Sequence, residues 1–91
     1  MVVWTPRARA DLKGIHDYII EDSPINTKKV VNQILSKAES LAELPTIGKI
    51  VPETNDELLR EVSVQSWRII YHIQNSKVFI VTLIHKRRHI E

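Results

Sequence analysis

Apolar residues recur at helical spacing in the first part of the chain. They follow one another at steps of four, three and four residues: Ala8, Leu12, Ile15 and Ile19. This spacing places them on one stripe of an α-helix. Thr5-Pro6 is a typical helix start, because threonine caps an N-terminus and proline is tolerated at the first helical position. We therefore predict a helix that begins at Pro6.

The same start pattern returns at Asp22-Ser23-Pro24, which ends the first helix and begins a second one. The second helix has a wide apolar face made of Val30, Val31, Ile34, Leu35, Ala38, Leu41 and Ala42. Pro45 ends it. Because the connection between the two helices is so short, we expect them to form an antiparallel hairpin.

The second half of the chain is typical of strands. After a polar loop from Thr46 to Glu57, three β-like runs follow, at 58–64, 67–73 and 78–84. The segments between them are short enough for hairpin turns, which predicts an antiparallel meander. Residues 2–4 are a further short β-prone segment. The predicted fold is α+β, in the order β-α-α-β-β-β, with a helical hairpin packed on an antiparallel sheet.

Both faces of the predicted sheet carry apolar groups. In the second run, Trp67, Ile69, Tyr71 and Ile73 alternate with Arg68, Ile70 and His72, and in the third run, Val78, Ile80, Thr82 and Ile84 alternate with Phe79, Val81 and Leu83. A helical hairpin covers only one face, and large exposed apolar patches are unusual on monomers, so the other face needs a partner, a dimer mate or the folded-back tail. We interpret the other face as a partner-binding surface formed by Ile70, His72, Ile80 and Ile84. The alternative is that the loop at 46–57 or the first helix covers it.

The length and composition narrow the class of protein. Ninety-one residues predict one domain, spanning 1–91. The chain has no cysteine, and its histidines show no helical pairing, so we expect no metal site. It also has no glycine-rich phosphate loop, and we expect no cofactor. No apolar run approaches a membrane span or a signal peptide, which predicts a cytoplasmic protein without membrane contact.

Charge is distributed unevenly along the chain. The net charge is only +2, but residues 85–89 read His-Lys-Arg-Arg-His, whereas Glu53, Asp56 and Glu57 make the middle loop acidic. A basic cluster suits an anionic partner, either a nucleic acid or an acidic protein. The alternative is a solvated C-terminal end.

The element order and several local motifs resemble the RelE/ParE superfamily of toxins from bacterial type II toxin–antitoxin systems. The motifs are Trp4-Thr5-Pro6, Asp22-Ser23-Pro24, Leu44-Pro45 with Gly48, Val51-Pro52-Glu53, Arg60-Glu61-Val62, Trp67-Arg68-Ile69-Ile70-Tyr71 and His85-Lys86-Arg87-Arg88. Together they cover nearly the whole chain. The resemblance implies a cognate antitoxin as partner, in a toxin–antitoxin hetero-oligomer.

Two activities occur among the proteins that this sequence resembles. In ribosome-dependent mRNA endonucleases, the resemblance implies catalytic roles for Arg68, His85, Arg87 and Glu53. In either kind of toxin, Arg60, Arg68, Lys86, Arg87 and Arg88 would bind phosphate or the target. A histidine is suited to general acid–base catalysis, and arginines stabilise charge on phosphate oxygens. From the residues alone, Arg68 could instead pair with Glu61, and Glu53 could be a solvated loop acid.

The C-terminal end resembles ParE-like toxins more closely than ribonucleases. Some ribonuclease members have a terminal tyrosine and others a pair of lysines before the meander, and this chain has neither. We therefore favour a ParE-like toxin that inhibits DNA gyrase by binding. The alternatives are an mRNA endonuclease that acts with the translating ribosome, and a degenerate homologue that binds an antitoxin without being toxic.

Overall fold

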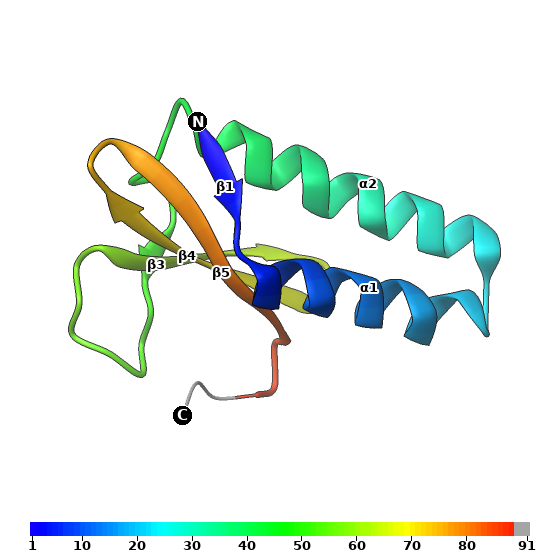
Figure 1. The fold of residues 1–91 in the computed structure, drawn as a ribbon. Coiled ribbons are helices and arrows are strands. Elements are labelled where there is room, and N and C mark those ends of the chain that lie inside the picture. The colour runs from blue at the N-terminus through cyan, green and yellow to red at the C-terminus, as the bar shows by residue number, and fades with distance from the viewer. Residues whose placement is uncertain (89–91) are drawn as a thin grey trace.

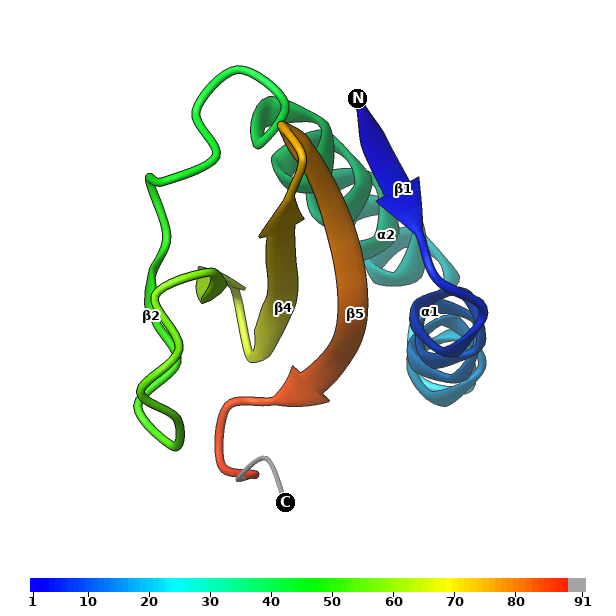
Figure 2. The same cartoon turned by 60° about the vertical axis from the view of Figure 1, so that its left-hand side comes forward.

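The structure, a computed structural model, describes residues 1–88. Its elements are β1 (Val2–Trp4), α1 (Pro6–Ile20), α2 (Pro24–Ser40), β2 (Lys49–Ile50), β3 (Leu59–Val64), β4 (Trp67–Gln74) and β5 (Lys77–His85). They form one mixed sheet in the order β1-β5-β4-β3-β2, with the two helices on one side of it (Figures 1 and 2). The α+β class and the predicted element order are confirmed. His89, part of the predicted basic cluster, lies outside the described residues.

Both helices begin where the capping patterns predicted. The Thr5 hydroxyl accepts the N–H of Ala8 at 3.2 Å, and the Ser23 hydroxyl accepts that of Asn26 at 3.2 Å. Pro6 and Pro24 occupy the first helical turn in each case. Each serine or threonine cap satisfies an N–H that has no partner within the helix. The capping residues therefore determine where the hairpin begins and turns.

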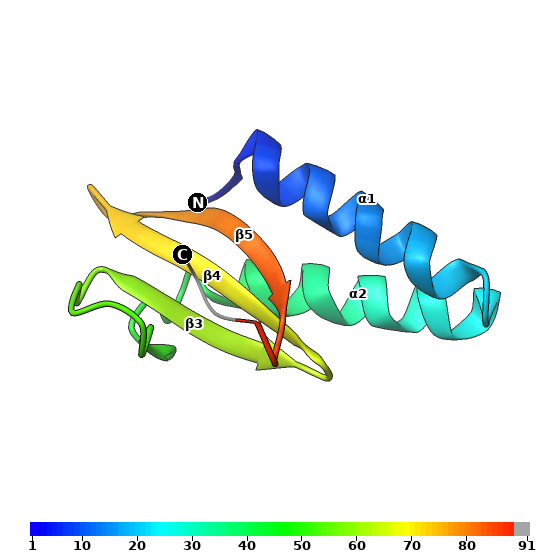
Figure 3. The same cartoon turned by 90° about the horizontal axis from the view of Figure 1, so that it is seen from below.

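Strands β3, β4 and β5 form the predicted antiparallel meander and lie side by side in Figure 3. Two pairings were not predicted from the sequence. The three residues of β1 pair in parallel with 78–80 of β5, and the two residues of β2 pair with Arg60 and Glu61 of β3. Strands this short leave almost no periodic pattern, so their pairing depends on tertiary structure.

A β-bulge changes which side chains of β5 face the helices. Ile70 pairs with Thr82, but the next residue, Tyr71, pairs with Ile80, so Val81 is an extra residue on β5. Ile80 and Leu83 consequently both belong to the core cluster beneath the hairpin. The prediction that Ile80 lies on the opposite face, with Ile84, is wrong because an uninterrupted alternation was assumed.

Polar contacts attach α1 to the edge of β5. The Thr5 hydroxyl donates to the carbonyl oxygen of Ile80 at 2.7 Å. One turn into the helix, the Asp11 carboxylate accepts the N–H of Leu83 at 3.1 Å and the hydroxyl of Thr82. Because β1 covers only the first part of β5, these side chains satisfy backbone groups that would otherwise form an open sheet edge.

Candidate functional site

Arg68 lies at the centre of a buried charge cluster on the sheet face away from the helices. Its guanidinium has five N–H donors, and each one has an acceptor. Nε and Nη2 donate to the two carboxylate oxygens of Glu61 at 2.8 and 2.9 Å. Nη2 and Nη1 donate to the two oxygens of Glu53 at 2.8 and 2.9 Å. Nη1 also donates to the carbonyl oxygen of Arg88 at 2.7 Å. The hydrogen-bonding capacity of Arg68 is therefore fully used.

Three other segments of the chain meet at this guanidinium. Glu61 is on β3, diagonally across from Arg68, which itself pairs with Ser63. Glu53 comes from the loop that follows β2, and Arg88 comes from the turn that follows β5. Hydrogen bonds with Glu53, and then with Glu61, raise the pKa of Arg68, so its charge is retained. The cluster connects the loop and the C-terminal turn to the sheet.

A cleft of about 470 Å³ opens beside the cluster. Its lining comprises Lys49, Pro52, Glu53, Glu61, Ser63, Arg68, Lys86 and Arg88. Four cationic and two anionic side chains are included, which gives the cleft a net charge of +2. The lysines and Arg88 can attract an anionic group to the rim, but Arg68 is already held by two carboxylates. We call this the Arg68 cleft.

His85 lies on the other side of the sheet. It pairs in register with Trp67, and directly paired residues point to the same face of a sheet. Consecutive residues of a strand point to opposite faces, so Arg68 points to the face opposite Trp67 and His85. The Trp67 and His85 rings meet edge to face, with centroids 5.4 Å apart. The His85 Nδ1 accepts the N–H of Arg87 at 3.2 Å. The predicted grouping of Arg68 and His85 on one surface is wrong.

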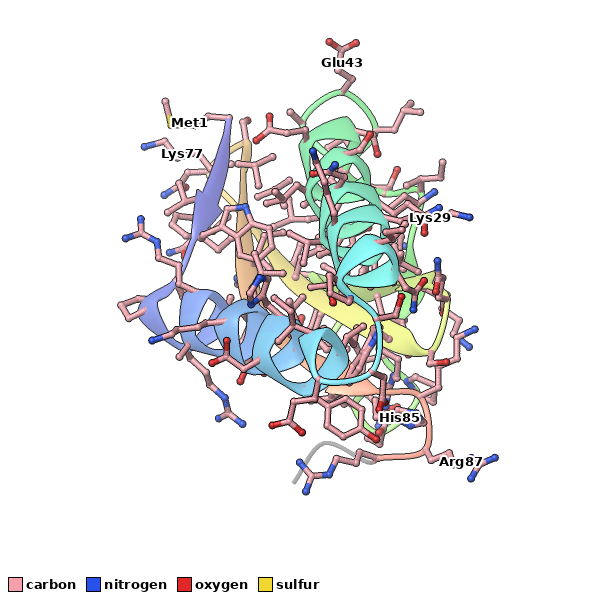
Figure 4. The ribbon with its side chains drawn as sticks, turned by 90° about the vertical axis from the view of Figure 1, so that its right-hand side faces the viewer. Met1, Lys29, Glu43, Lys77, His85 and Arg87 are labelled. Atoms are coloured by element: carbon pink, nitrogen blue, oxygen red, sulfur yellow. The ribbon has the colours of Figure 1, made fainter. Side chains whose placement is uncertain are left out.

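A second cleft, of about 430 Å³, surrounds His85 beneath the turn of the helical hairpin. It is lined by Tyr18, Ile19, Asp22, Asn26, Val30, Gln65, Ser66, Trp67 and His85. Viewed from the turn of the hairpin, His85 and Arg87 occupy the same corner of the molecule (Figure 4). Tyr18 was not among the predicted site residues, although its position off the apolar stripe of its helix was an indication available in the sequence. We call this the Tyr18 cleft.

Arg60 has a structural role on the helix-facing side. It pairs with Tyr71, and its Nη1 donates to the carbonyl oxygens of Gly48 at 2.9 Å and Thr46 at 3.4 Å. The Tyr71 hydroxyl donates to the carbonyl oxygen of Pro45 at 2.7 Å and accepts the N–H of Gly48 at 2.9 Å. Arg60 and Tyr71 therefore hold the segment that follows α2. Arg60 is not brought together with Arg68, contrary to the predicted grouping.

The predicted open face is partly closed by the protein's own chain. Arg68 and Ile70 are 6% and 1% exposed, whereas His72 and Ile84 are half-buried. Glu53 from the loop and the backbone of Arg88 both reach Arg68 across this face. The Nε2 atom of His72 lies 3.8 Å from Asp56. Coverage by the loop, the alternative left open by the sequence, is therefore what occurs around Arg68, and Ile70 is unavailable to a partner in this structure.

Neither of the helices within residues 1–88 is long and apolar enough to cross a membrane. Across the same residues, no three side chains of metal-binding type are grouped so as to hold a metal ion.

A family model described as the ParE toxin of the type II toxin–antitoxin system parDE matches residues 2–90. Toxin RelE2 of Caulobacter vibrioides is 39% identical over 87 residues, with 96% of each chain covered.

Solved structures agree at the level of fold. A chain of the chromosomal ParDE system from P. aeruginosa superposes with a TM-score of 0.75 at 21% identity, covering 92% of both chains. A chain of the RelBE2 toxin–antitoxin complex from Mycobacterium tuberculosis gives 0.69 at 20% identity, covering 94% of this chain and 96% of that one.

These similarities define the class as the toxins of type II toxin–antitoxin systems, within the RelE/ParE superfamily. Within that class, the chain belongs to the ParE toxin family, whose model matches almost its entire length.

Proposed function

We propose that this toxin acts by binding its target rather than by cleaving RNA, and that the target is DNA gyrase. The single observation that carries the proposal is that the guanidinium of Arg68 has no free N–H donor. In the ribonuclease interpretation, Arg68 is the cation that would have to be free to stabilise charge on the phosphate. Two carboxylates and a backbone carbonyl already occupy all five donors of Arg68, while the candidate acid–base residue His85 is on the opposite face.

The proposal includes a cognate antitoxin as partner, in a cytoplasmic hetero-oligomer. Support comes from the solved relatives, which are components of toxin–antitoxin systems. A partner that presents acidic residues would complement the +2 lining of the Arg68 cleft. Lys49, Lys86 and Arg88 are the residues that would meet it.

A ribosome-dependent mRNA endonuclease remains the second candidate function. The observation that favours it is the 39% identity to a toxin named RelE2, together with the meeting of Glu53 and Arg68 in one cleft. For phosphate to reach Arg68, the Glu53 carboxylate would have to move away. His85 could take part only if the substrate reached both faces of the sheet.

Paired assays with the same purified toxin test the proposal. We expect loss of gyrase supercoiling activity, or trapping of gyrase on cleaved DNA, and no new breaks in an mRNA translated with the toxin. Untouched supercoiling at saturating toxin, together with mRNA breaks in the ribosomal A site that His85→Gln abolishes, would replace the proposal by the second candidate.

Growth separates both candidates from a non-toxic homologue. Expression of the toxin without its antitoxin should arrest growth, and co-expression of the neighbouring antitoxin gene should restore it. Replacing Lys86 and Arg88 together by glutamine should weaken the toxicity if the Arg68 cleft contacts the target. Replacing Arg7 and Arg9 together by glutamine, which removes two exposed cations at the start of α1, is the matched control. Normal growth at high expression of the wild type would contradict both toxic functions.

A further inference from the structure

The outward face of α1 carries charges that are sorted by position along the helix. From its start to its middle the charged residues are Arg7, Arg9 and Lys13, and the acidic residues Asp17 and Glu21 follow in its last turns and at its C-cap. All five are exposed. In Figure 3, α1 forms one margin of the molecule, with α2 and the sheet on its other side. The charged face of α1 therefore points away from the rest of the chain.

This order of charges does not stabilise α1 itself. A helix dipole favours acidic residues in the first turn and basic residues in the last, and α1 has neither. Arg9 and Lys13 are like charges four residues apart, which destabilises a helix. The same holds for Asp17 and Glu21. Within residues 1–88, Lys13 and Glu21 form no ion pair, and Asp17 is paired with the adjacent His16 ring at 3.1 Å. The order of charges therefore has no structural explanation within a single copy.

The middle of this face carries small residues. Ala10 and Gly14 lie between its basic and its acidic end, and both are exposed. A Cβ added at Gly14 would meet nothing within 4 Å, so no other segment covers the helix there. Positions 7, 10, 14, 17 and 21 follow one another at steps of three and four, which places them on one stripe of the helix. A second helix can approach this stripe closely, because the separation of packed helices depends on the side chains between them.

We propose that two copies of this chain pair through their α1 helices, which run antiparallel with a two-fold axis beside Gly14. This axis places Arg7 of one copy opposite Glu21 of the second copy. It also brings Lys13 within two positions of Asp17 of the second copy along the helix axis, which is about 3 Å. By symmetry each of these ion pairs forms twice. Charges that destabilise a single helix thus become attractive contacts between two copies.

Tyr18 gains a contact in the same arrangement. Its side chain is 70% exposed and does not belong to the core cluster. Across the two-fold axis it lies opposite Ala10 of the second copy, whose small side chain leaves room for the ring. Aromatic side chains are enriched at protein interfaces because they bury a large apolar area and keep a polar end. An aromatic residue that the fold of one chain leaves uncovered is therefore covered in the pair.

The order of charges identifies a second copy as the occupant. A nucleic acid or a uniformly acidic protein would be attracted by Lys13 but repelled by Asp17 and Glu21. A uniformly basic partner would meet the opposite difficulty. Complementarity along the whole helix requires a partner with the reverse order of charges, and α1 read in the opposite direction has that order.

The dimer should be weak and sensitive to salt. A helix of 15 residues is about 22 Å long. We expect a contact along one such helix to bury less than the roughly 1,200 Å² of stable interfaces. Salt screens exposed charges, so it should weaken the contact. The Arg68 cleft is on the sheet face away from the helices and stays open in the pair, so this contact is separate from target binding and its loss should leave toxicity unchanged.

Charge reversal in the 91-residue chain tests the pairing. Sedimentation velocity at low salt should show a monomer–dimer equilibrium that shifts towards monomer as salt is added. Lys13→Glu and Asp17→Lys should each weaken the dimer about tenfold, because two exposed ion pairs become repulsive. An equimolar mixture of these two variants should associate as tightly as the wild type, since each copy then complements the other. Lys28→Glu, which reverses an exposed charge on α2, is the matched control and should leave the equilibrium unchanged.

A crosslink tests the position of the two-fold axis. The chain has no cysteine, so Gly14→Cys introduces a single thiol. Where two helices cross at this residue, the Cα atoms come within the roughly 4.4–6.8 Å that a disulfide spans. Diamide, which accepts the two electrons and two protons of the thiols, should therefore link two copies covalently. Lys28→Cys should stay monomeric under the same conditions, and adding Lys13→Glu to Gly14→Cys should slow the linkage.

Three outcomes would overturn the proposal. One is a single monomeric species at every concentration up to the solubility limit. Another is a mixture of Lys13→Glu and Asp17→Lys that associates no better than either variant alone. The third is equal crosslinking of Gly14→Cys and Lys28→Cys. Because these positions are exposed, the variants should keep the circular dichroism spectrum of the wild type, which separates loss of pairing from misfolding. Neither gyrase nor an antitoxin enters these measurements, so their failure is distinguishable from failure of the proposed function.

Discussion

Arg68 and His85 lie on neighbouring strands, yet their side chains leave opposite faces of the sheet. His85 pairs with Trp67, whereas Arg68 pairs with Ile84. A side chain that holds phosphate and one that transfers a proton must reach the same few ångströms of substrate. These two residues cannot do so in the described arrangement, which separates the molecule into a charged Arg68 cleft and an aromatic Tyr18 cleft.

Removal of the Arg68 guanidinium should strongly destabilise the protein. Arg68→Ala leaves two carboxylates facing each other, with Glu61 4% and Glu53 15% exposed at their side chains. We expect the free energy of unfolding in urea to fall by about 3 kcal/mol or more, as for other buried pairs that lose one partner. Arg87→Ala, at an exposed position, should change it by less than about 0.5 kcal/mol. Equal effects of the two variants would mean that the cluster contributes little.

Neutralising Glu53 and Glu61 should restore part of the stability that is lost when Arg68 is replaced. Combining Arg68→Met with Glu53→Gln and Glu61→Gln replaces the ionic cluster by uncharged groups of similar size. Because replacing all members of a buried ionic cluster is far less costly than breaking it, the triple variant should be more stable than Arg68→Met alone. Urea unfolding measures both, and a triple variant less stable than the single one would contradict the charge-based explanation.

Tyr71 should make the protein sensitive to alkaline pH. Burial raises the pKa of Tyr71 above its ordinary value of 10.0, so the unfolded chain loses this proton at a lower pH than the folded protein does. The stabilisation is complete below pH 10 and is lost as pH rises through the folded-state pKa. Tyr71→Phe should remove this part of the alkaline loss. It should also cost about 1–3 kcal/mol at neutral pH, because the buried Gly48 N–H loses its acceptor. Parallel urea titrations at several alkaline pH values check both effects.

The two glycines should respond oppositely to alanine. A Cβ at Gly48 would lie 2.6 Å from the carbonyl oxygen of Glu61 and also against the Tyr71 hydroxyl, so Gly48→Ala should lower Tm. A Cβ at Gly14, on the exposed side of α1, meets nothing within 4 Å. Gly14→Ala should therefore stabilise the helix by about 0.5–1 kcal/mol. Calorimetry measures the Tm of both variants. A Tm of Gly48→Ala above that of the wild type would contradict the prediction and would show that the contact with Tyr71 relaxes easily.

Asp11 should protect the backbone amides at the edge of β5 from hydrogen exchange. Its carboxylate accepts the N–H of Leu83 and the hydroxyl of Thr82, where β1 no longer covers the strand. Asp11→Ala should speed hydrogen exchange at the Leu83 amide, because that N–H loses its acceptor. Exchange at Ile69, in the middle of the meander, is the internal reference and should change less. Equal changes at both amides would indicate global destabilisation instead.

The sequence predicted those features that short windows of residues determine. Thr5 and Ser23 begin helices because their hydroxyls satisfy N–H groups only three residues ahead. The three strands of the meander were recognisable because neighbouring runs are joined by short turns, and nearly the whole chain carried the motifs of its family. For Arg68, the sequence left open whether it binds phosphate or pairs with Glu61. The pairing could be foreseen because adjacent hairpin strands bring the two residues together.

Tertiary structure decided which side chains share a surface. A single extra residue at Val81 turned Ile80 into the core, and no local pattern marks a bulge of this kind. The N–H donors of Arg68 are fully used only because Glu53 and Arg88 accept from them. These residues lie 15 and 20 positions away in the chain and reach Arg68 when the loop and the C-terminal turn fold over the sheet. Whether a buried charge is available or satisfied depends on contacts between distant segments, and these exist only in the folded chain.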